Sequence, residues 1–250
     1  QERASILSYH LGGFPTEQLR SFTDVLLGPT PADLERMARA IKRSARIERR
    51  QVRVEDVEKN MPKRVKQSNV ALRRVAIHEL GHAVVALGSG FVDKVEVILN
   101  EWLAGDYGSQ SAGVVHHHFK NSIEYTESFL RSQIRVALAG MAAEELVLGS
   151  RSEGAGNADG CDLDIATRIA KRMVLSLGMG RTPRFYGDET RLPSDLLLSA
   201  PLSSEVDRIL QAEFENTKVF LTDKGAVLTR LSDALVEKKR LILRSEDVEM

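Results

Sequence analysis

The sequence predicts a mainly α-helical protein with a small β-sheet, in which a helical region precedes a larger, mostly helical domain. Apolar residues recur at helical spacing through residues 5–60 and through most of the second half of the chain. Two runs with strand character lie within residues 91–119. A charged segment at residues 61–68 separates the two helical regions. We therefore expect two domains, residues 1–62 and residues 63–250.

The composition is that of an ordinary globular protein. The chain has 250 residues, of which 42% are hydrophobic and 28% are charged. Its formal net charge is zero, which argues against a general nucleic-acid-binding function. The single cysteine, Cys161, gives no disulfide framework and favours a reducing compartment. No apolar run reaches the ~18 residues of a membrane-spanning helix, and the first residues resemble the interior of a longer protein.

Glycine and proline divide the first helical region into short segments. Thr30 is a suitable N-cap residue, and Pro31 follows it at the first helical position. We expect helices or helical turns at residues 5–11, 16–27, 31–50 and 55–59, with a short extended piece at 52–54.

The end of this region is basic. Residues 35–66 contain 12 Lys or Arg against five Asp or Glu. We interpret this excess as a solvated basic face. The alternative is an electrostatic contact with a neighbouring subunit or another acidic surface.

The second region alternates between helices, two strands and glycine-rich loops. Asn121, followed three residues later by Glu124, resembles a capping box at the start of a long helix. We expect helices at residues 69–87, 122–148 and 162–177, strands at 92–99 and 112–119, an irregular stretch at 180–200, and helical structure from 201 to 250 with a break near 223–225.

The helix expected at 69–87 contains an H-E-x-x-H motif. On an α-helix, residues four apart lie on one face, so the rings of His78 and His82 can hold one metal ion. Two imidazoles and a carboxylate favour zinc with an open fourth position, which makes the motif zincin-type. Glu79 lies beside them, where its carboxylate can take a proton from an attacking water. Apolar neighbours predict that these polar groups are partly buried, and such groups need partners.

The third protein ligand is open from the residues alone. A metzincin would need Gly and His where Val85 and Gly88 stand. A thermolysin-like site would use Glu144 or Glu145 from a later helix, whereas Asp162 begins the helix after the glycine-rich loop.

Three consecutive histidines occupy the second expected strand. In a strand, His116 and His118 would share one face and His117 would lie on the other. We interpret them as part of an exposed or cleft-lining strand and not as a second metal site, because no nearby acidic or cysteine ligand supports one.

The chain resembles the FtsH family of ATP-dependent zinc proteases. The stretches that carry the resemblance are His78–Val85, Ala142–Gly149, Gly154–Asn157, Asp162–Thr167, Met173–Val174 and Gly178–Met179. Residues 6–60 resemble the helical lid subdomain of an AAA+ ATPase, which precedes the peptidase domain in that family. The resemblance therefore covers nearly the whole chain.

The resemblance implies the identity of the third ligand. In that family it is an Asp four residues before an Ala-Thr pair, which is Asp162 here. The family usually has Asn directly before this Asp, but Asn157 stands five positions earlier, so Asp159 and Asp164 are rivals. Glu144 would then orient one of the ligating histidines.

The resemblance also implies a function. We expect a zinc-dependent endopeptidase domain that degrades unfolded or misfolded proteins as part of a homo-hexameric ring in protein quality control. Substrate would lie extended along Gly113, Val114 and Val115. ATP and Mg²⁺ would belong to an upstream module, because this chain lacks a G-x-x-x-x-G-K-[ST] loop.

Two further expectations concern the location of the protein and a competing function. We expect a cytoplasmic protein, or one at the cytoplasmic face of a membrane that is anchored through segments before this chain. The competing interpretation is a proteolytically inactive zinc-binding scaffold for ring assembly or chaperone work, and Glu79 argues against it. A plain helical interaction module would bind no metal at all.

Overall fold

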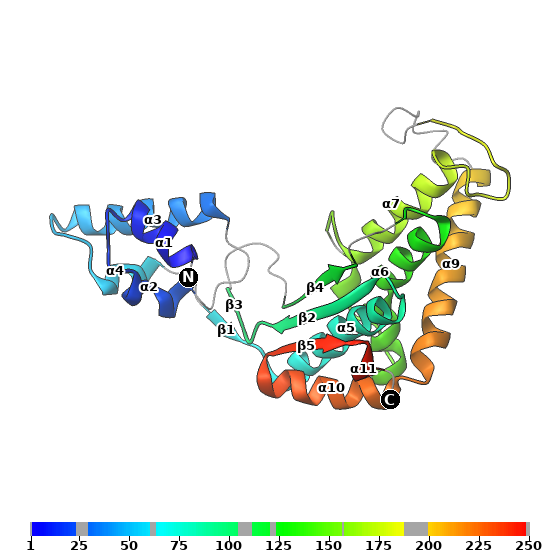
Figure 1. Ribbon diagram of the computed structural model, residues 1–250. Coiled ribbons are helices and arrows are strands. Elements are labelled where there is room, and N and C mark those ends of the chain that lie inside the picture. The colour runs from blue at the N-terminus through cyan, green and yellow to red at the C-terminus, as the bar shows by residue number, and fades with distance from the viewer. Residues whose placement is uncertain are drawn as a thin grey trace. The chain divides into compact units, whose positions relative to one another are not determined.

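The computed structural model describes residues 2–23, 30–60, 64–104, 112–120, 124–156, 158–187 and 200–248 (Figure 1). The chain forms two compact units. Unit 1 contains residues 1–68 and 100–112, and unit 2 contains residues 69–99 and 113–250. Residues 100–112 thus return to the first unit after the chain has entered the second. The identity of the first region as an ATPase lid stays a prediction.

Unit 1 is a small helical bundle with one two-stranded ribbon. Its elements are α1 (Glu2–His10), α2 (Thr16–Thr23), α3 (Pro31–Ile47), α4 (Val54–Asn60), β1 (Arg64–Lys66) and β3 (Trp102–Ala104). Leu7, Leu19, Met37 and Ile41 are fully buried between the helices. Thr30 is the N-cap of α3, as expected, and it forms a capping box with Asp33, in which each side chain accepts the other residue's main-chain N–H.

Strands β1 and β3 correct two sequence-based expectations. We expected a charged segment at 61–68, and no strand between those expected at 92–99 and 112–119. Residues 64–66 instead pair antiparallel with 102–104. Three-residue strands are too short to show a two-residue period, so the pairing of segments distant in sequence decides their structure.

Unit 2 places the H-E-x-x-H helix at its centre. Its helices are α5 (Asn69–Gly88), α6 (Glu127–Leu148), η1 (Glu153–Ala155), α7 (Asp162–Leu175), α9 (Ala200–Thr222), α10 (Gly225–Lys238) and α11 (Ser245–Val248). Helix α6 begins at Glu127 and not at 122, because Thr126 is the N-cap and its hydroxyl accepts the N–H of Phe129. The expected N-cap, Asn121, lies outside the described residues.

A three-stranded antiparallel sheet covers α5. Its order is β4 (Gly113–Phe119), β2 (Val92–Leu99), β5 (Arg240–Arg244), so β4 is an edge strand among the described residues. Strand β5 corrects the expectation of helix throughout 201–250. Its five residues are too few to show a strand period, and pairing with β2 decides its structure, with Val95 opposite Leu243.

Close packing fixes α5 against α6. A Cβ atom at Gly81 would lie 2.5 Å from the carbonyl oxygen of Ala139 and 2.7 Å from Cβ of Ala143, so glycine permits this approach. A second apolar core joins α6, α7 and α9 around Ile134, Met173 and Ile209. The packing of α5 on α6 and this apolar core together hold α5, α6 and the start of α7 in place. None of the described helices combines the length and apolar composition needed to span a bilayer.

Candidate metal centre

Two imidazoles and one carboxylate converge at the meeting point of α5 and α7. The ring centroids of His78 and His82 are 4.8 Å apart. Oδ2 of Asp162, the first residue of α7, lies 3.1 Å from Nε2 of His78 and 3.2 Å from Nε2 of His82. The histidines are only 7% and 8% exposed. Among the described residues, this is the group of His, Cys, Asp and Glu side chains whose geometry could hold a metal ion.

Each histidine is fixed from behind by an acceptor. Nδ1 of His78 lies 2.8 Å from Oε1 of Glu144, and Nδ1 of His82 lies 2.7 Å from the carbonyl oxygen of Val136. Because a carbonyl and a carboxylate only accept, both Nδ1 atoms donate. The Nε2 atoms, which face Asp162, are then the nitrogens that could bind a metal ion.

Glu144 is itself held by three donors. It is 1% exposed, and it accepts hydrogen bonds from His78, from Arg74 at 2.6 Å and from Ser152 at 2.8 Å. Burial alone would raise the pKa of Glu144, but these hydrogen bonds lower it below its ordinary value. Arg74 also donates to the carbonyl oxygen of Ser150 at 2.8 Å. The network therefore joins α5, the end of α6 and the loop that leads toward Asp162.

The donor set and the space around it fit zinc. Two neutral imidazoles and a carboxylate are a usual three-residue set for catalytic zinc. A Cβ at Gly140 would lie 2.5 Å from Nε2 of His78 and 2.6 Å from Nε2 of His82, so only glycine leaves that side of the site open. Burial lowers the pKa of His78, but the carboxylates of Asp162 and Glu144 outweigh it and raise that pKa to about 9. The carboxylates thus favour positive charge here, which a divalent cation supplies.

Glu79 lies against the first residue of β4. A Cβ at Gly113 would be 2.5 Å from Cγ and 2.8 Å from Oε1 of Glu79, so this strand can approach Glu79 because residue 113 has no side chain. Burial raises the pKa of Glu79, against the opposing charges of His82 and His78. A carboxylate with a raised pKa is a better acceptor of a proton from water.

The three strand histidines do not join this cluster. His116 and His118 are exposed, and His117 is half-buried on the opposite face of β4. Burial, together with the charges of His82 and His116, lowers the pKa of His117 to about 4, so its ring is neutral near pH 7. Its Nε2 is buried and has no hydrogen-bond partner within the described part of the chain.

The carboxylates that were alternatives to Asp162 are paired with other groups or exposed. Asp164 accepts the N–H of Gly160 at 2.7 Å and pairs with Arg168 at 2.6 Å. Asp159 is exposed in the preceding turn. Glu145 pairs with Arg151 at 2.9 Å. Of the predicted site residues, the structure brings together His78, His82, Asp162 and Glu144, and it places Glu79 beside Gly113.

Sequence reasoning missed three contributors. Gly140 carries a signal, since an isolated glycine within a helical pattern indicates a close approach. Arg74 stands four residues before His78 and therefore on the same face of α5, which was readable from the spacing. The carbonyl oxygen of Val136 has no sequence signal, because any residue supplies one.

The comparisons with known proteins agree with this geometry. Residues 65–249 match the family model described as Peptidase family M41. The chain is 30% identical over 96% of its length to the ATP-dependent zinc metalloprotease FtsH of Magnetococcus marinus. It is 34% identical over 70% of its length to the FtsH of Methylococcus capsulatus, and 28% identical over 96% to that of Thermus thermophilus.

The chain spans only part of each relative, namely 38%, 28% and 40% of their lengths in the same order. The predicted resemblance to FtsH proteases is confirmed, and so is the mainly α-helical fold with a small sheet. Because the family model covers most of the chain, this protein belongs to Peptidase family M41.

Proposed function

We propose that this chain is the zinc-dependent endopeptidase part of an FtsH-like, ATP-dependent protease. The observation that carries the proposal is the convergence of His78, His82 and Asp162, whose ligand atoms lie within 4.8 Å of one another, beside the carboxylate of Glu79. Neither a scaffold nor an interaction module needs a base at this position.

The chemistry divides between the ion and the chain. Zinc, when bound, polarises the scissile carbonyl and lowers the pKa of water. His78, His82 and Asp162 would hold it, and Glu144 would keep the His78 ring in its donating tautomer at Nδ1. Glu79 takes the proton of the attacking water and passes it to the leaving amine nitrogen as the peptide bond breaks.

The edge of β4 supports an extended binding mode for the substrate. The N–H of Asn100 donates to the carbonyl oxygen of Ala112, so residues 98 and 114, two positions further along the ladder, form the next hydrogen-bonded pair. The main-chain groups of Val115 and His117 then point away from β2. A peptide can add to that edge as a strand, which would bring it past Gly113 and the adjacent Glu79.

Main-chain pairing reads the shape of an extended chain more than its sequence. This property suits unfolded or misfolded proteins as substrates. We further propose that the whole protein is a homo-hexamer, that an upstream module binds ATP and Mg²⁺, and that any membrane attachment at the cytoplasmic face lies outside this chain. No nucleic acid is needed in this scheme.

The variant Glu79→Gln tests the proposal. Zinc content, measured by elemental analysis, should equal that of the wild type, whereas casein hydrolysis should fall by roughly 10²–10⁴-fold. Addition of a chelator to the wild type should abolish hydrolysis, and zinc should restore it. Retained hydrolysis in the variant refutes the role of Glu79. A zinc-loaded wild type that never cleaves casein favours the inactive scaffold instead.

A further inference from the structure

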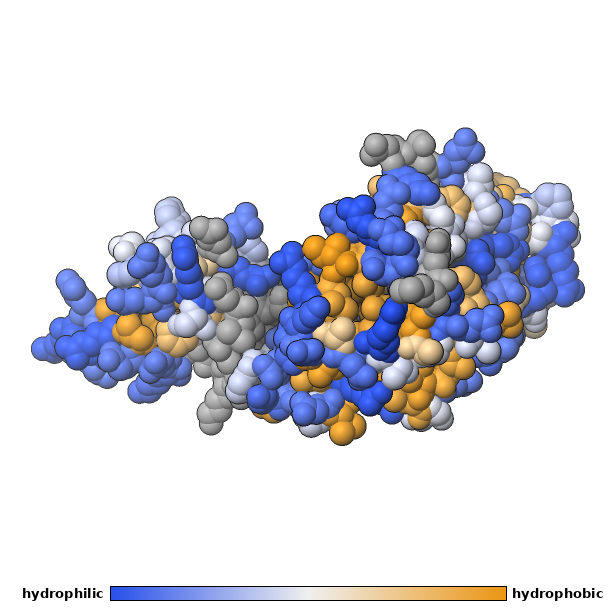
Figure 2. Space-filling model, turned by 60° about the horizontal axis from the view of Figure 1, so that its bottom comes forward, coloured by the Kyte–Doolittle hydropathy of each residue, from blue (hydrophilic) through white to orange (hydrophobic). Residues whose placement is uncertain are grey.

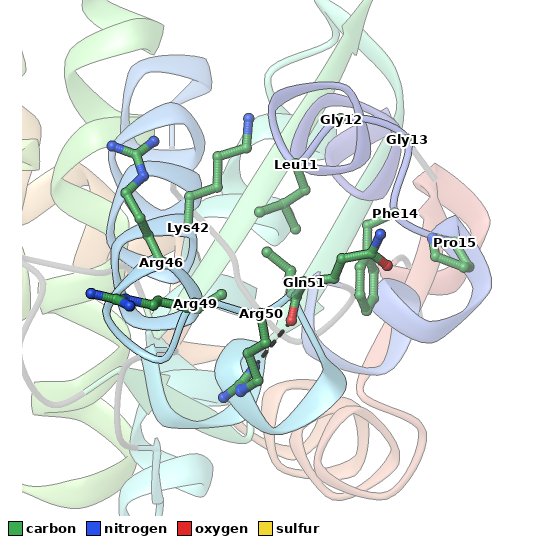
Figure 3. A pocket seen from close by; sticks show the side chains of 12 residues that line it. Leu11, Gly12, Gly13, Phe14, Pro15, Lys42, Arg46, Arg49, Arg50 and Gln51 are labelled. Atoms are coloured by element: carbon green, nitrogen blue, oxygen red, sulfur yellow. Dashed lines mark hydrogen bonds between the residues drawn. The ribbon is translucent and has the colours of Figure 1, made fainter.

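An open hollow of about 1030 Å³ lies within unit 1, where two helices end (Figure 3). The segment after α1 forms one side, with Leu11 and Phe14. The last turns of α3 and the residues after it form the other side, with Lys42, Arg46 and Arg49. The hollow therefore has an apolar floor and a basic wall.

In the described part of the chain, the three cations of this wall have no acidic partner. Arg50, which also lines the hollow, pairs with Asp56 at 2.5 Å and with Glu48 at 2.6 Å. Within the described ranges, no such ion pair is formed by Lys42, Arg46 or Arg49. Figure 3 shows the stems of these three side chains against the helix and their charged ends reaching outward. These three residues, the basic rim, lie on the α3 side of the hollow, across from the apolar floor of Leu11 and Phe14.

Arg49 occupies a position that favours glycine. Its φ is 51°, in the left-handed region, where it follows the end of α3. The N–H of Arg50 donates back to the carbonyl oxygen of Ala45, which is the usual glycine-capped ending of a helix. A side chain here costs free energy that glycine would avoid. Helix capping therefore does not explain the guanidinium at this position.

The charge of the whole unit points the same way. Residues 1–68 and 100–112 carry 14 Lys or Arg against 11 Asp or Glu, although the chain as a whole has no net charge. On the side shown in Figure 2, the surface of unit 1 is mostly hydrophilic, with a smaller apolar patch. Its excess charge is positive, so an acidic ligand would be attracted to it.

We propose that this hollow binds an acidic segment of a polypeptide, with an apolar side chain on the floor of Leu11 and Phe14 and carboxylates at the rim of Lys42, Arg46 and Arg49. The choice of peptide over phosphate follows from the apolar residues of the hollow. Leu11 and Phe14 can contact an apolar side chain, which a peptide carries and phosphate lacks, and phosphate sites use helix N-terminal ends, whereas α1 and α3 both end at the hollow. The carboxylates of the peptide reach the guanidinium groups.

Binding of short fluorescent peptides, followed by anisotropy at low salt, tests this proposal. A peptide rich in Glu with one Leu should bind, and its Gln-substituted counterpart should bind about tenfold more weakly or not at all. The double variant R46A/R49A should weaken binding of the Glu peptide by about tenfold. The matched control R43A removes an exposed arginine of the same helix that does not line the hollow, and it should leave binding unchanged.

Two further variants separate binding from folding. Arg49→Gly should weaken binding while the melting temperature does not fall, because glycine adopts this φ without steric cost. The charge-reversed R46E/R49E should bind a Lys-substituted peptide in place of the Glu peptide.

The proposal is overturned by equal binding of the Glu and Gln peptides, by no binding of either, or by an equal loss in R43A. Displacement of the peptide by inorganic phosphate or ATP at comparable concentrations would show a phosphate site. None of these results bears on peptide hydrolysis, so the peptidase assignment is tested separately.

Discussion

The metal centre of unit 2 and the basic hollow of unit 1 differ in the burial and pairing of their charged side chains. In the metal centre, Glu144 is 1% exposed and has three donors, and both histidines are fixed at Nδ1. In the hollow, the described structure gives Lys42, Arg46 and Arg49 no acidic partner, and their charged ends are in solvent. Burial makes an unpaired charge costly, whereas exposure does not. The first site is therefore preorganised, and the second is adaptable.

One arginine of the hollow, Arg50, is paired with a buried carboxylate, as Arg74 is in the metal centre. Asp56 is 3% exposed, and Arg50 donates to both of its carboxylate oxygens, at 2.5 and 2.8 Å. Arg74 plays the same part for Glu144. In both units a buried carboxylate is thus paired with one arginine, whereas Lys42, Arg46 and Arg49 have no acidic partner within the described residues.

The sharpest test concerns the carboxylate that joins the two imidazoles. Asp162→Asn removes the anionic ligand, so the purified variant should lose its zinc on dialysis. Asp164→Asn is the matched control, because Asp164 is committed to Gly160 and Arg168, and its zinc content should equal that of the wild type. Elemental analysis measures both. If only the Asp164 variant lost zinc, the ligand would be Asp164 and not Asp162.

Gly140→Ala tests whether the two imidazole rings of the buried site can move to make room for an added methyl group. The added Cβ would lie 2.5 and 2.6 Å from the two Nε2 atoms, and the rings cannot retreat without losing their Nδ1 partners. Zinc affinity should fall by at least the roughly 10–100-fold that follows when ligand orientation is lost. Gly154→Ala is the control, since its nearest neighbour would be 3.4 Å away. Competition with a fluorescent chelator gives both affinities, and equal values would contradict a rigid site.

Arg74→Met tests the network behind His78. Glu144 would keep its charge in a buried place with one donor fewer, so zinc affinity should fall by roughly tenfold and the free energy of unfolding by about 1–3 kcal/mol. The neighbouring Arg73 is more exposed and lies 3.7 Å from Asp233, so Arg73→Met should change neither quantity noticeably. Chelator competition and urea titration measure them. Rescue of zinc affinity by Arg74→Lys would show that charge, and not packing, is required.

The smallest effect concerns the pH dependence of unit 1. The hydrogen bonds from Arg50 and from the N–H of Arg53 lower the pKa of Asp56 from 3.8 to about 2. Because the folded pKa lies below the ordinary value, Asp56 stabilises unit 1 above pH 3.8, and this stabilisation is lost as the pH falls through about 2. Asp56→Asn should therefore lower the melting temperature at pH 6 more than at pH 2. Fluorescence of Trp102, the single tryptophan and part of unit 1, reports the transition. A difference between the two proteins that does not depend on pH would contradict this origin.

The local parts of the fold and site were predictable from sequence. The helix at residues 69–87 and the strand at residues 92–99 follow from the period of their apolar residues, and the structure has them at Asn69–Gly88 and Val92–Leu99. The pairing of His78 with His82 follows from helix geometry alone. These predictions rest on neighbours within one or two turns.

The remaining parts depend on contacts between distant segments. The residues alone left Asp162 level with Glu144 and Glu145, because Asp162 reaches the histidines only after α7 packs on α6. Strand β5 was missed for the same reason, since β2, some 140 residues earlier, decides its conformation. Gly140 and Arg74 act through contacts with residues that are distant in sequence, so the sequence indicates their roles only weakly.

The position of β5 in the chain has a consequence for synthesis. The ribosome makes His78, His82 and Asp162 well before residues 240–244, which complete the sheet on the far side of β2 from β4. A nascent chain can therefore contain every proposed ligand while the proposed substrate-binding edge still lacks the strand that completes its sheet. The order of translation thus predicts that a chain truncated before residue 240 has all the proposed zinc ligands without the complete sheet.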